Sequence, residues 1–503
     1  MVSGEQRATV VSQPPESAFA AAAQFFRRRW LLCAGLSAIV LVPCFWQRRI
    51  QAGDLASHAY NAWLAQLIER GEAPGLWIAP QWNNVLFDLA LQTLGNRFGL
   101  HAAETVAVSA AVLMFFWGAF ALASAAARRA AWPIAPILAM LAYGWTFQMG
   151  FFNYYLSLGF TFLALALLWR GRGSERAAVL LLLPLIWLAH PLGVILLAGA
   201  GLWIIAAEQV SLRGKLLAGA AAVAALIAIR LYIVGHYQVF RSREPRYFFN
   251  GADQLLLYGP QYRRPLTLLL AFVLAAVVTE AMHRRSTNER ATSLFVSLQL
   301  YGLVLLAIFL LPETIGLPQY AAPAGFLHER LSFICAIFAC CALASLKPAK
   351  WQVAGFCAAA AVFFFYLYGD TAKINRLEDQ AERIAQSLPP GARVLATIPP
   401  PDGSRIFIFH IVDRACIGRC FSYGNYEPGS GQFRVRANLG NRFATTSMSA
   451  SFAMQRGEYT VQPQDLPLFQ ISRCETNAAE LCVRPLAAGE RNGSKVGTVS
   501  NMP

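Results

Sequence analysis

Charged residues are scarce in this chain, and its long apolar runs are almost free of them. Asp, Glu, Lys and Arg make up 14% of the 503 residues, whereas 56% are hydrophobic. Apolar runs of about 17 to 22 residues recur from Trp30 to Gly369, long enough as helices to cross a hydrocarbon core of about 30 Å. The period-two alternation of a membrane β-barrel is missing. The composition therefore predicts a helical membrane protein with many spans.

Features typical of several other protein classes are also lacking. The apolar runs carry no acidic residue at their centres, where pumps and transporters usually place ionisable groups, and no internal repeat indicates an inverted-repeat transporter. The net charge of +15 is not accompanied by a basic, aromatic-rich patch on a soluble segment, so nucleic acid is not an expected partner. Pro43-Cys44-Phe45-Trp46 has no small-x-small cleavage pattern, so we expect the first span to be an uncleaved signal anchor.

Positive charge is concentrated in alternate loops between the apolar runs. The runs predict about eleven spans: Trp30 to Trp46, Ala103 to Ala126, Trp132 to Met149, Tyr154 to Trp169, Ala177 to Ala189, Leu192 to Ala207, Leu216 to Val234, Leu266 to Met282, Ala291 to Leu311, Leu331 to Leu346 and Trp351 to Tyr368. One side, which the positive-inside rule assigns to the cytoplasm, then receives six basic clusters: Arg27 to Arg29, Arg128 with Arg129, Arg170 to Arg176, Arg213 with Lys215, Arg284 to Arg290, and Lys347 with Lys350. Asp54 and everything after Asp370 are expected to face outward.

The predicted fold is mainly α: a polytopic transmembrane helical bundle with juxtamembrane helices in its first outward loop and a small α+β C-terminal extracytoplasmic domain. We expect a disordered cytoplasmic tail at 1–26, a transmembrane domain at 27–369 with its first outward loop at 47–101, the α+β domain at 370–488 and a disordered tail at 489–503. In the outward domain, Ala372 to Leu388 has helical periodicity, and Arg393 to Ile398 and Arg405 to Val412 have the pattern of strands.

The ten cysteines divide by location. Six lie in or beside spans and are expected to be small core hydrophobes: Cys33, Cys44, Cys335, Cys340, Cys341 and Cys357. The others lie in the outward domain, where an oxidising compartment permits two disulfides: Cys416, Cys420, Cys474 and Cys482. Free thiols and a zinc site are the alternatives, but the spacings are not a standard zinc pairing and no His cluster accompanies them.

The polar segment Gly53 to Asn61 directly follows the first span. From Asp54 onward the sequence predicts a helix at the membrane surface, with an apolar stripe formed by Tyr60, Trp63, Leu64, Leu67 and Ile68. Asp54, His58 and Asn61 lie in one sector away from that stripe. At the interface, these three side chains could face a cleft while the aromatic side contacts lipid headgroups, and Asn61 is predicted as a substrate-binding residue. The alternative is that Asp54 caps the helix and His58 hydrogen-bonds to it.

The order of these parts resembles the C-type (GT-C) glycosyltransferase superfamily, integral membrane enzymes that use lipid-phosphate-linked sugars. The resemblance covers about the first 370 residues as architecture, and its motif-level anchor is Gly53-Asp54 with His58. It implies that Asp54, the acidic residue of the first outward loop, is the catalytic base. A second, adjacent acidic residue of several members is replaced here by Leu55. That replacement argues against the metal dependence that uses such a pair, and a divalent metal stays open as a cofactor.

The mechanism that the resemblance implies is direct displacement at the anomeric carbon. Asp54 takes a proton from an acceptor hydroxyl while the lipid phosphate leaves from the opposite face, which inverts the configuration. A solvated Asp has a pKa of about 3.9, so the base would be ionised at neutral pH. His58 would orient Asp54 or share the proton.

Two outward segments offer groups that could bind the donor phosphate. The first lies between Gly235 and Pro265 and supplies the predicted substrate-binding residues Arg241, Arg243, Arg246, Tyr247, Tyr262, Arg263 and Arg264. Its alternative role is contact with anionic lipid headgroups, with the tyrosines as an interfacial belt. The second is His328-Glu329-Arg330, also predicted to bind substrate, with Arg330 as the further phosphate ligand. The alternative for this run is an interfacial boundary stabilised by an ion pair.

These expectations combine into one functional prediction. The chain would be a membrane glycosyltransferase that moves a sugar from a polyprenyl-phosphate-linked donor to a glycan, lipid or protein acceptor at the extracytoplasmic face. The resemblance and the compact loops favour a bacterial inner membrane, with a cytoplasmic N-terminus and a periplasmic or extracellular C-terminal domain. One rival is a lipid or polysaccharide transporter or flippase without bond cleavage. Another is an outward receptor or assembly module that the spans merely anchor.

Overall fold

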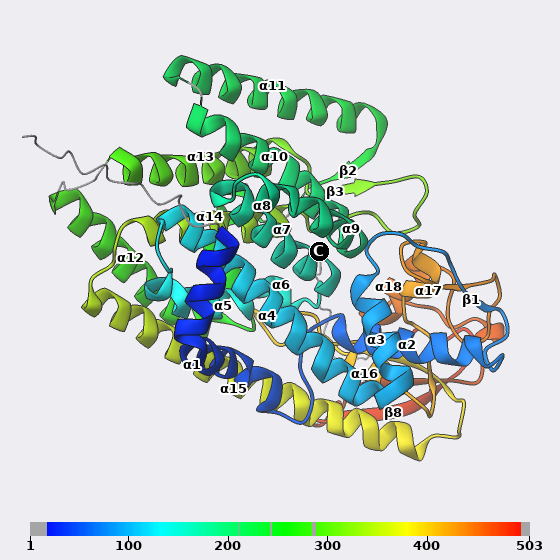
Figure 1. The fold of residues 1–503 in the computed structure, drawn as a ribbon. Coiled ribbons are helices and arrows are strands. Elements are labelled where there is room, and N and C mark those ends of the chain that lie inside the picture. Colours follow the sequence, from blue (N-terminus) through cyan, green and yellow to red (C-terminus); the bar gives the residue numbers. More distant parts are fainter. Residues whose placement is uncertain (1–17, 210, 242–243, 284–287, 494–503) are drawn as a thin grey trace, which may run out of the picture.

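Long apolar helices form the body of the protein in the computed structural model, which describes residues 18–209, 211–241, 244–283 and 288–493 (Figure 1). In these ranges, eight helices are long and apolar enough to cross a membrane. They are α1 (Ala18–Phe45), α4 (Leu100–Ala127), α7 (Phe152–Arg170), α11 (Leu212–His236), α12 (Arg263–His283), α13 (Asn288–Leu310), α14 (Leu327–Ser345) and α15 (Lys350–Ser387). A shorter apolar helix, α10 (Pro191–Gln209), packs against α7. A mainly helical fold is thus confirmed, with eight candidate membrane-spanning helices where the uninterrupted apolar runs predicted spans.

Two of the predicted spans are short, interrupted helices. The segment 132–149 is divided into η1 (Trp132–Ile134), α5 (Ala135–Ala142) and α6 (Trp145–Gln148). The segment 177–189 contains the end of α8 (Ser174–Ala177) and α9 (Val179–Ala189). The first break follows from Gly144, whose backbone is extended and where an added Cβ would lie 2.8 Å from the carbonyl oxygen of Gln254. The count of eleven spans remains a prediction.

The loop between α1 and α4 holds α2 (Leu55–Glu69), β1 (Leu76–Ile78) and α3 (Leu86–Phe98). We expected α2 to rest on the membrane surface, but its residues from Leu55 to Ala65 are all buried. The reason is that α3 and α16 (Ile411–Ala415) of the C-terminal part pack against it. The apolar stripe therefore faces protein, and so does the polar sector that contains His58 and Asn61.

The C-terminal part contains a mixed four-stranded sheet, in the order β5-β4-β7-β8. Its strands are β5 (Phe421–Ser422), β4 (Arg393–Thr397), β7 (Leu468–Arg473) and β8 (Leu481–Leu486), and the nearby short helices are α17 (Glu427–Ser430), α18 (Met448–Arg456) and η5 (Pro463–Asp465). The strand predicted at 393–398 corresponds to β4. The strand predicted at 405–412 was wrong, because Ile406 and Ile408 enter the core without a partner strand and α16 begins at Ile411.

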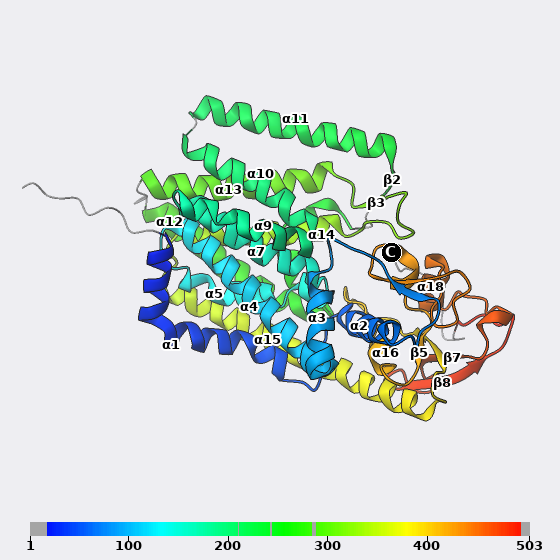
Figure 2. The same cartoon turned by 45° about the vertical axis from the view of Figure 1, so that its right-hand side comes forward.

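The C-terminal part and the loop between α1 and α4 are built together. β1 pairs antiparallel with β6 (Val435–Ala437), and one hydrophobic core includes residues of both parts. Figure 2 shows α2, α16 and the strands β5, β7 and β8 gathered at one end of the helical body. A second small ribbon, β2 (Gln238–Phe240) with β3 (Thr314–Gly316), joins two other loops. The turns η2 (Arg246–Phe248), η3 (Ala252–Leu255) and η4 (Pro260–Tyr262) complete the fold.

The chain ends and the cysteines differ in part from expectation. α1 begins at Ala18, within the segment expected to be a disordered tail, and residues 1–17 lie outside the described ranges. At the other end, Arg491 forms a β-bridge with Thr460, and the buried Asn492 donates to the carbonyl oxygen of Met454. Residues 489–493 of the tail that was expected to be disordered are therefore ordered, and residues 494–503 lie outside the described ranges. Of the alternatives for the outward cysteines, the structure has two disulfides, Cys416–Cys420 and Cys474–Cys482.

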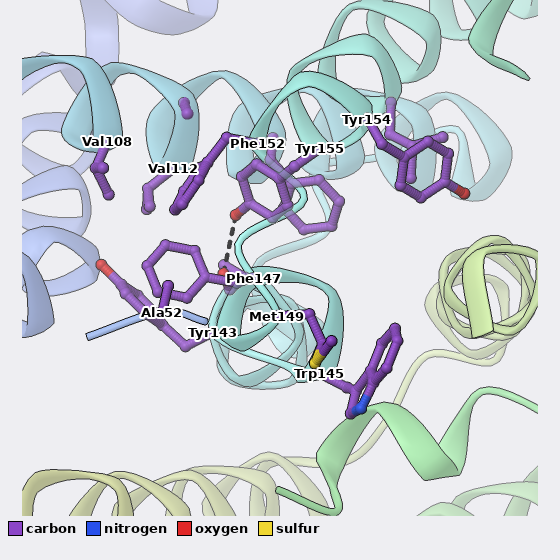
Figure 3. Close-up of a cluster of buried hydrophobic side chains, with 14 of the residues drawn as sticks. Ala52, Val108, Val112, Tyr143, Trp145, Phe147, Met149, Phe152, Tyr154 and Tyr155 are labelled. Atoms are coloured by element: carbon purple, nitrogen blue, oxygen red, sulfur yellow. Dashed lines mark hydrogen bonds between the residues drawn. The ribbon is translucent and has the colours of Figure 1, made fainter. Parts of the chain in front are cut away.

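An aromatic cluster fixes the interrupted segment α5–α6 inside the helical body (Figure 3). The Tyr155 hydroxyl donates to the carbonyl oxygen of Ala142 at 2.9 Å, and the Tyr143 hydroxyl donates to that of Val40 at 2.7 Å. Phe147 packs edge-on against Tyr143 and Phe152. This packing holds the turn after α6 in place, and that turn carries the candidate site.

Candidate active site

A close contact between two backbone segments holds Asp54. The Gly53 amide donates to the carbonyl oxygen of Gln148 at 2.6 Å, and the Asp54 amide donates to that of Met149 at 3.0 Å. Both glycines at this contact are needed. A Cβ on Gly53 would lie 2.9 Å from the Met149 oxygen, and one on Gly150, where φ is +84°, would lie 2.5 Å from the Asp54 nitrogen. The interrupted segment α5–α6 thus fixes the start of α2.

The Asp54 side chain faces a histidine that is far away in the sequence. Asp54 occupies the N-cap position of α2, yet its side chain makes no capping hydrogen bond, so the capping alternative is wrong. Its Oδ1 lies 3.4 Å from Nε2 of His410. Nδ1 of His410 lies 2.6 Å from Oδ2 of Asp413, which also accepts a hydrogen bond from the amide of Asn425 at 2.8 Å. The result is an Asp–His–Asp series in which Asp54 is the most exposed member, at 18% of its side-chain surface.

Burial and charge act against each other in this series. Burial raises the pKa of Asp54, and the positive charges of His410 and His58 offset part of that rise. Burial alone would lower the pKa of His410, but the carboxylates of Asp413 and Asp54 raise it above its ordinary value. The arrangement therefore favours a cationic His410 between two carboxylates, with Asp54 as a stronger base than a solvated Asp.

His58 pairs with a residue of α3 and not with Asp54. Its Nδ1 lies 2.7 Å from Oδ1 of Asp88, whose other oxygen accepts a hydrogen bond from Asn153 at 2.8 Å. Burial opposes the protonation of His58, but the Asp88 carboxylate raises its pKa to about 9. Although burial acts to raise it, the pKa of Asp88 is lowered, chiefly by His58. The charge of His58 thus acts on Asp54, but the His58 side chain is hydrogen-bonded to the carboxylate of Asp88.

This pair makes the stability of the protein dependent on pH. The His58 pKa rises from 6.5 to about 9 on folding, so its contribution is complete below pH 6.5 and is lost as the pH rises through about 9. The Asp88 contribution is lost when the pH falls through its lowered pKa. We expect His58→Gln to cost on the order of 3 kcal/mol at pH 6 and much less above pH 9.5. Thermal unfolding in detergent measures the loss of stability at both pH values.

The matched control is the exposed His101. His101→Gln should leave the melting temperature unchanged at both pH values. If His58→Gln were equally destabilising at pH 6 and above pH 9.5, the ion pair would not be the source of the effect.

A second polar group surrounds a small cavity beside the pair. Ser57 donates to Glu427 at 2.8 Å, and burial raises the pKa of Glu427 to about 7. Asn61 donates to the carbonyl oxygen of Ser57 at 2.9 Å, and its own Oδ1 is buried and has no hydrogen-bond partner among the residues that the structure describes. Asn61, Asp88, Glu427 and Arg434 line a cavity of about 20 Å³, enough for one water molecule. Asn61 therefore lies near the candidate site but faces this cavity.

Arg330 is the arginine whose charge acts on Asp54. Its guanidinium lies over the rings of Phe151 and Tyr154, with 4.8 and 5.6 Å to the ring centroids, and its Nε is buried without a hydrogen-bond partner among the described residues. The neighbouring His328 lies 3.0 Å from the carbonyl oxygen of Leu311. One carboxylate oxygen of Glu329 is buried without a hydrogen-bond partner.

The arginine-rich loop reaches the segment that holds Asp54 through Tyr258, which donates to Gln148 at 2.7 Å, and not through its predicted substrate-binding residues. In the described ranges, no hydrogen bond, ion pair or ring contact joins its predicted residues to Asp54. Three of these residues bond elsewhere: Arg246 donates to the carbonyl oxygen of Phe309, Arg264 donates to Tyr366 at 3.1 Å, and Tyr262 donates to Asp370 at 3.1 Å. Three others are exposed: Arg241, Tyr247 and Arg263. Arg243 lies outside the described residues. η2 packs against α13 and η4 against α12, whereas η3 packs against α14, α6 and α5.

His410, Asp413, Asp88 and Glu427 were missed from the sequence. The spacing of His410 and Asp413 was a usable signal, but the segment was assigned to a strand. For the divalent metal left open above, no group of three or more His, Cys, Asp or Glu side chains in the described part of the chain is placed to hold an ion. No protein-family model, curated protein or solved structure matches this chain.

Proposed function

We propose that this protein is a membrane glycosyltransferase in which Asp54 is the catalytic base. The observation that carries the proposal is the Asp54–His410–Asp413 series, a partly exposed carboxylate backed by a buried imidazole and a second carboxylate. Partial burial raises the pKa of Asp54, so the carboxylate needs a counter-charge to stay ionised, and His410 supplies it. The series lies where apolar helices meet a polar domain, the location at which a lipid-linked donor and a water-soluble acceptor would meet.

The reaction balances with the groups at hand. Asp54 accepts the proton of an acceptor hydroxyl, whose oxygen forms a bond to the anomeric carbon. The bond between that carbon and the phosphate oxygen breaks on the opposite face, and the polyprenyl phosphate leaves with the electron pair. The positive charge of Arg330, which acts on Asp54, would also balance the charge of the departing phosphate. The sugar is transferred with inversion.

The proposed setting follows from the charge pattern of the loops. The N-terminus would be cytoplasmic, and the candidate site and C-terminal part would face outward, in the periplasm or outside the cell. The donor would be a polyprenyl-phosphate-linked sugar, and the acceptor a glycan, lipid or protein. A bacterial inner membrane is the proposed location.

Replacing His410 tests its role as counter-charge. In His410→Gln the positive charge that stabilises ionised Asp54 is gone, so the Asp54 pKa should rise further. Asp54 works as a base above its pKa, so the acid limb of the kcat/KM profile should move to higher pH. We expect a loss of ~10-fold or more at pH 6 and a smaller loss at pH 9. Asp413→Asn should act in the same direction because Asp413 helps to keep His410 cationic. A uniform loss at all pH values would contradict this role.

Reconstituted vesicles separate the proposed enzyme from the rival transporter. The purified full chain is supplied with a radiolabelled polyprenyl-phosphate sugar and a crude acceptor fraction. Release of free polyprenyl phosphate together with labelled acceptor supports sugar transfer. Movement of intact labelled lipid between leaflets without cleavage would refute it.

A further inference from the structure

Three guanidinium groups gather where α11, β2 and the end of α13 meet. Arg230 lies near the end of α11, Arg241 directly follows β2, and Arg246 opens η2. Arg230 donates to the carbonyl oxygen of Leu310 at 2.6 Å, and Arg246 donates to that of Phe309. Both acceptors are carbonyls of the last turn of α13, which lack partners within the helix. Each of these two guanidinium groups has further N–H groups to offer a ligand.

No ion pair joins this cluster to a carboxylate in the described ranges, and the nearest carboxylate along the chain, Glu244, acts on Arg405. Burial lowers the pKa of Arg246, and the charges of Arg230 and Arg241 lower it further. Like charges held together without a counter-charge cost free energy, so an anion bound here would stabilise the structure.

The surroundings of the cluster are apolar and exposed. Four aromatic residues lie close to the three arginines, either in the sequence or by contact, and each exposes more than a third of its surface: Tyr232, Phe240, Tyr247 and Phe309. The apolar part of α11 has no buried residue. In both views α11 runs along the outside of the helical body and joins β2 at one end (Figures 1 and 2). A ligand with an anionic head and apolar chains would match both parts of this surface.

We propose that Arg230, Arg241 and Arg246 form a binding site for a lipid-borne phosphate, with its apolar chains along α11 and α13. Guanidinium groups suit phosphate oxygens, and aromatic side chains suit the headgroup zone of a bilayer. The site is separate from Asp54, whose arginine neighbour is Arg330. It does not rest on the proposed sugar transfer, because lipid retention is measured without turnover.

Lipid retention by the full chain tests this site. The protein is placed in nanodiscs of phosphatidylcholine with 20 mol% dioleoylphosphatidylglycerol, transferred to detergent, and its bound lipid is measured by native mass spectrometry. We expect the wild type to retain phosphatidylglycerol in preference to phosphatidylcholine. Arg246→Gln should weaken that retention by ~10-fold. Arg241→Gln should also weaken it, and since Arg241 is exposed, its loss leaves the fold intact.

The control variant and a soluble anion complete the test. Arg172→Gln removes an exposed arginine of the loop between α7 and α8 and should leave lipid retention unchanged. Equal weakening by Arg172→Gln, or no preference of the wild type for the anionic lipid, would overturn the proposal. Inorganic phosphate at 10 mM should not displace the lipid. If phosphate alone bound as well, the site would serve a water-soluble anion and the lipid assignment would be wrong.

Discussion

Asp54→Asn is expected to lower the kcat of sugar transfer by ~10³-fold or more while the protein stays folded and inserted. Asparagine keeps the shape of the side chain but cannot accept the proton of a hydroxyl. Asp54 makes no capping hydrogen bond, and its backbone amide holds its place through Met149. The loss should therefore come from chemistry and not from misfolding. Turnover in reconstituted vesicles measures the first, and the melting temperature in detergent measures the second.

An exposed aspartate provides the matched control for this substitution. Asp402 lies in the C-terminal part, away from the series, and Asp402→Asn should keep full activity. Substantial activity in Asp54→Asn would remove Asp54 from the mechanism. A lower melting temperature that accounts for the whole loss would assign Asp54 a structural role only.

The membrane helices could be predicted because their cause is local. An uninterrupted apolar run of about twenty residues satisfies its own backbone hydrogen bonds as a helix wherever it is placed. α4 and α11 therefore lie where the runs predicted them. The break at Gly144 has a cause that is distant in the sequence: the carbonyl oxygen of Gln254 lies so close that a side chain at position 144 would collide with it. Hydropathy does not report such approaches, so 132–149 resembled a continuous span.

The candidate site could be predicted only in part, for the same reason. Asp54 was identified from its position just beyond the first span, which is local information. Its partner His410 comes from a segment more than three hundred residues later, and no periodicity links the two. His58 lies one helical turn from Asp54, so the pairing of these two looked natural. The fold instead brings Asp88 from α3 to 2.7 Å from His58, and only the packing of α3 on α2 decides that choice.

The same packing depends on a buried ion network beneath α16. Arg414 lies 2.5 Å from Glu104 of α4 and 2.8 Å from Glu378 of α15, and it donates to the carbonyl oxygen of Ile50 at 3.1 Å. Nε of Arg49 lies 3.7 Å from the same Oε1 of Glu378. These four charged side chains are nearly fully buried, with two positive and two negative charges. The network fixes α16, and α16 begins next to His410.

Arg414→Met is expected to destabilise the protein by about 3 to 5 kcal/mol, because it leaves Glu104 and Glu378 buried with too little positive charge. Chemical unfolding in detergent measures this loss. Activity should fall as well, since α16 would no longer hold His410 against Asp54. Arg376, exposed on α15, gives the control: Arg376→Gln should change stability by less than about 0.5 kcal/mol.

A double variant shows whether the uncompensated charge is the cause. Glu104→Gln removes one of the carboxylates that Arg414→Met leaves unpaired, so the double variant should be more stable than Arg414→Met alone. Higher stability of the double variant than of Arg414→Met cannot come from packing, because Glu104→Gln does not restore the packing that Arg414→Met removes. If the destabilisations of Arg414→Met and Glu104→Gln simply added in the double variant, the free energy of unfolding would depend on the shape of the Arg414 side chain and not on its charge. That result would contradict the ion network as the interaction that holds α16, and with it His410, in place.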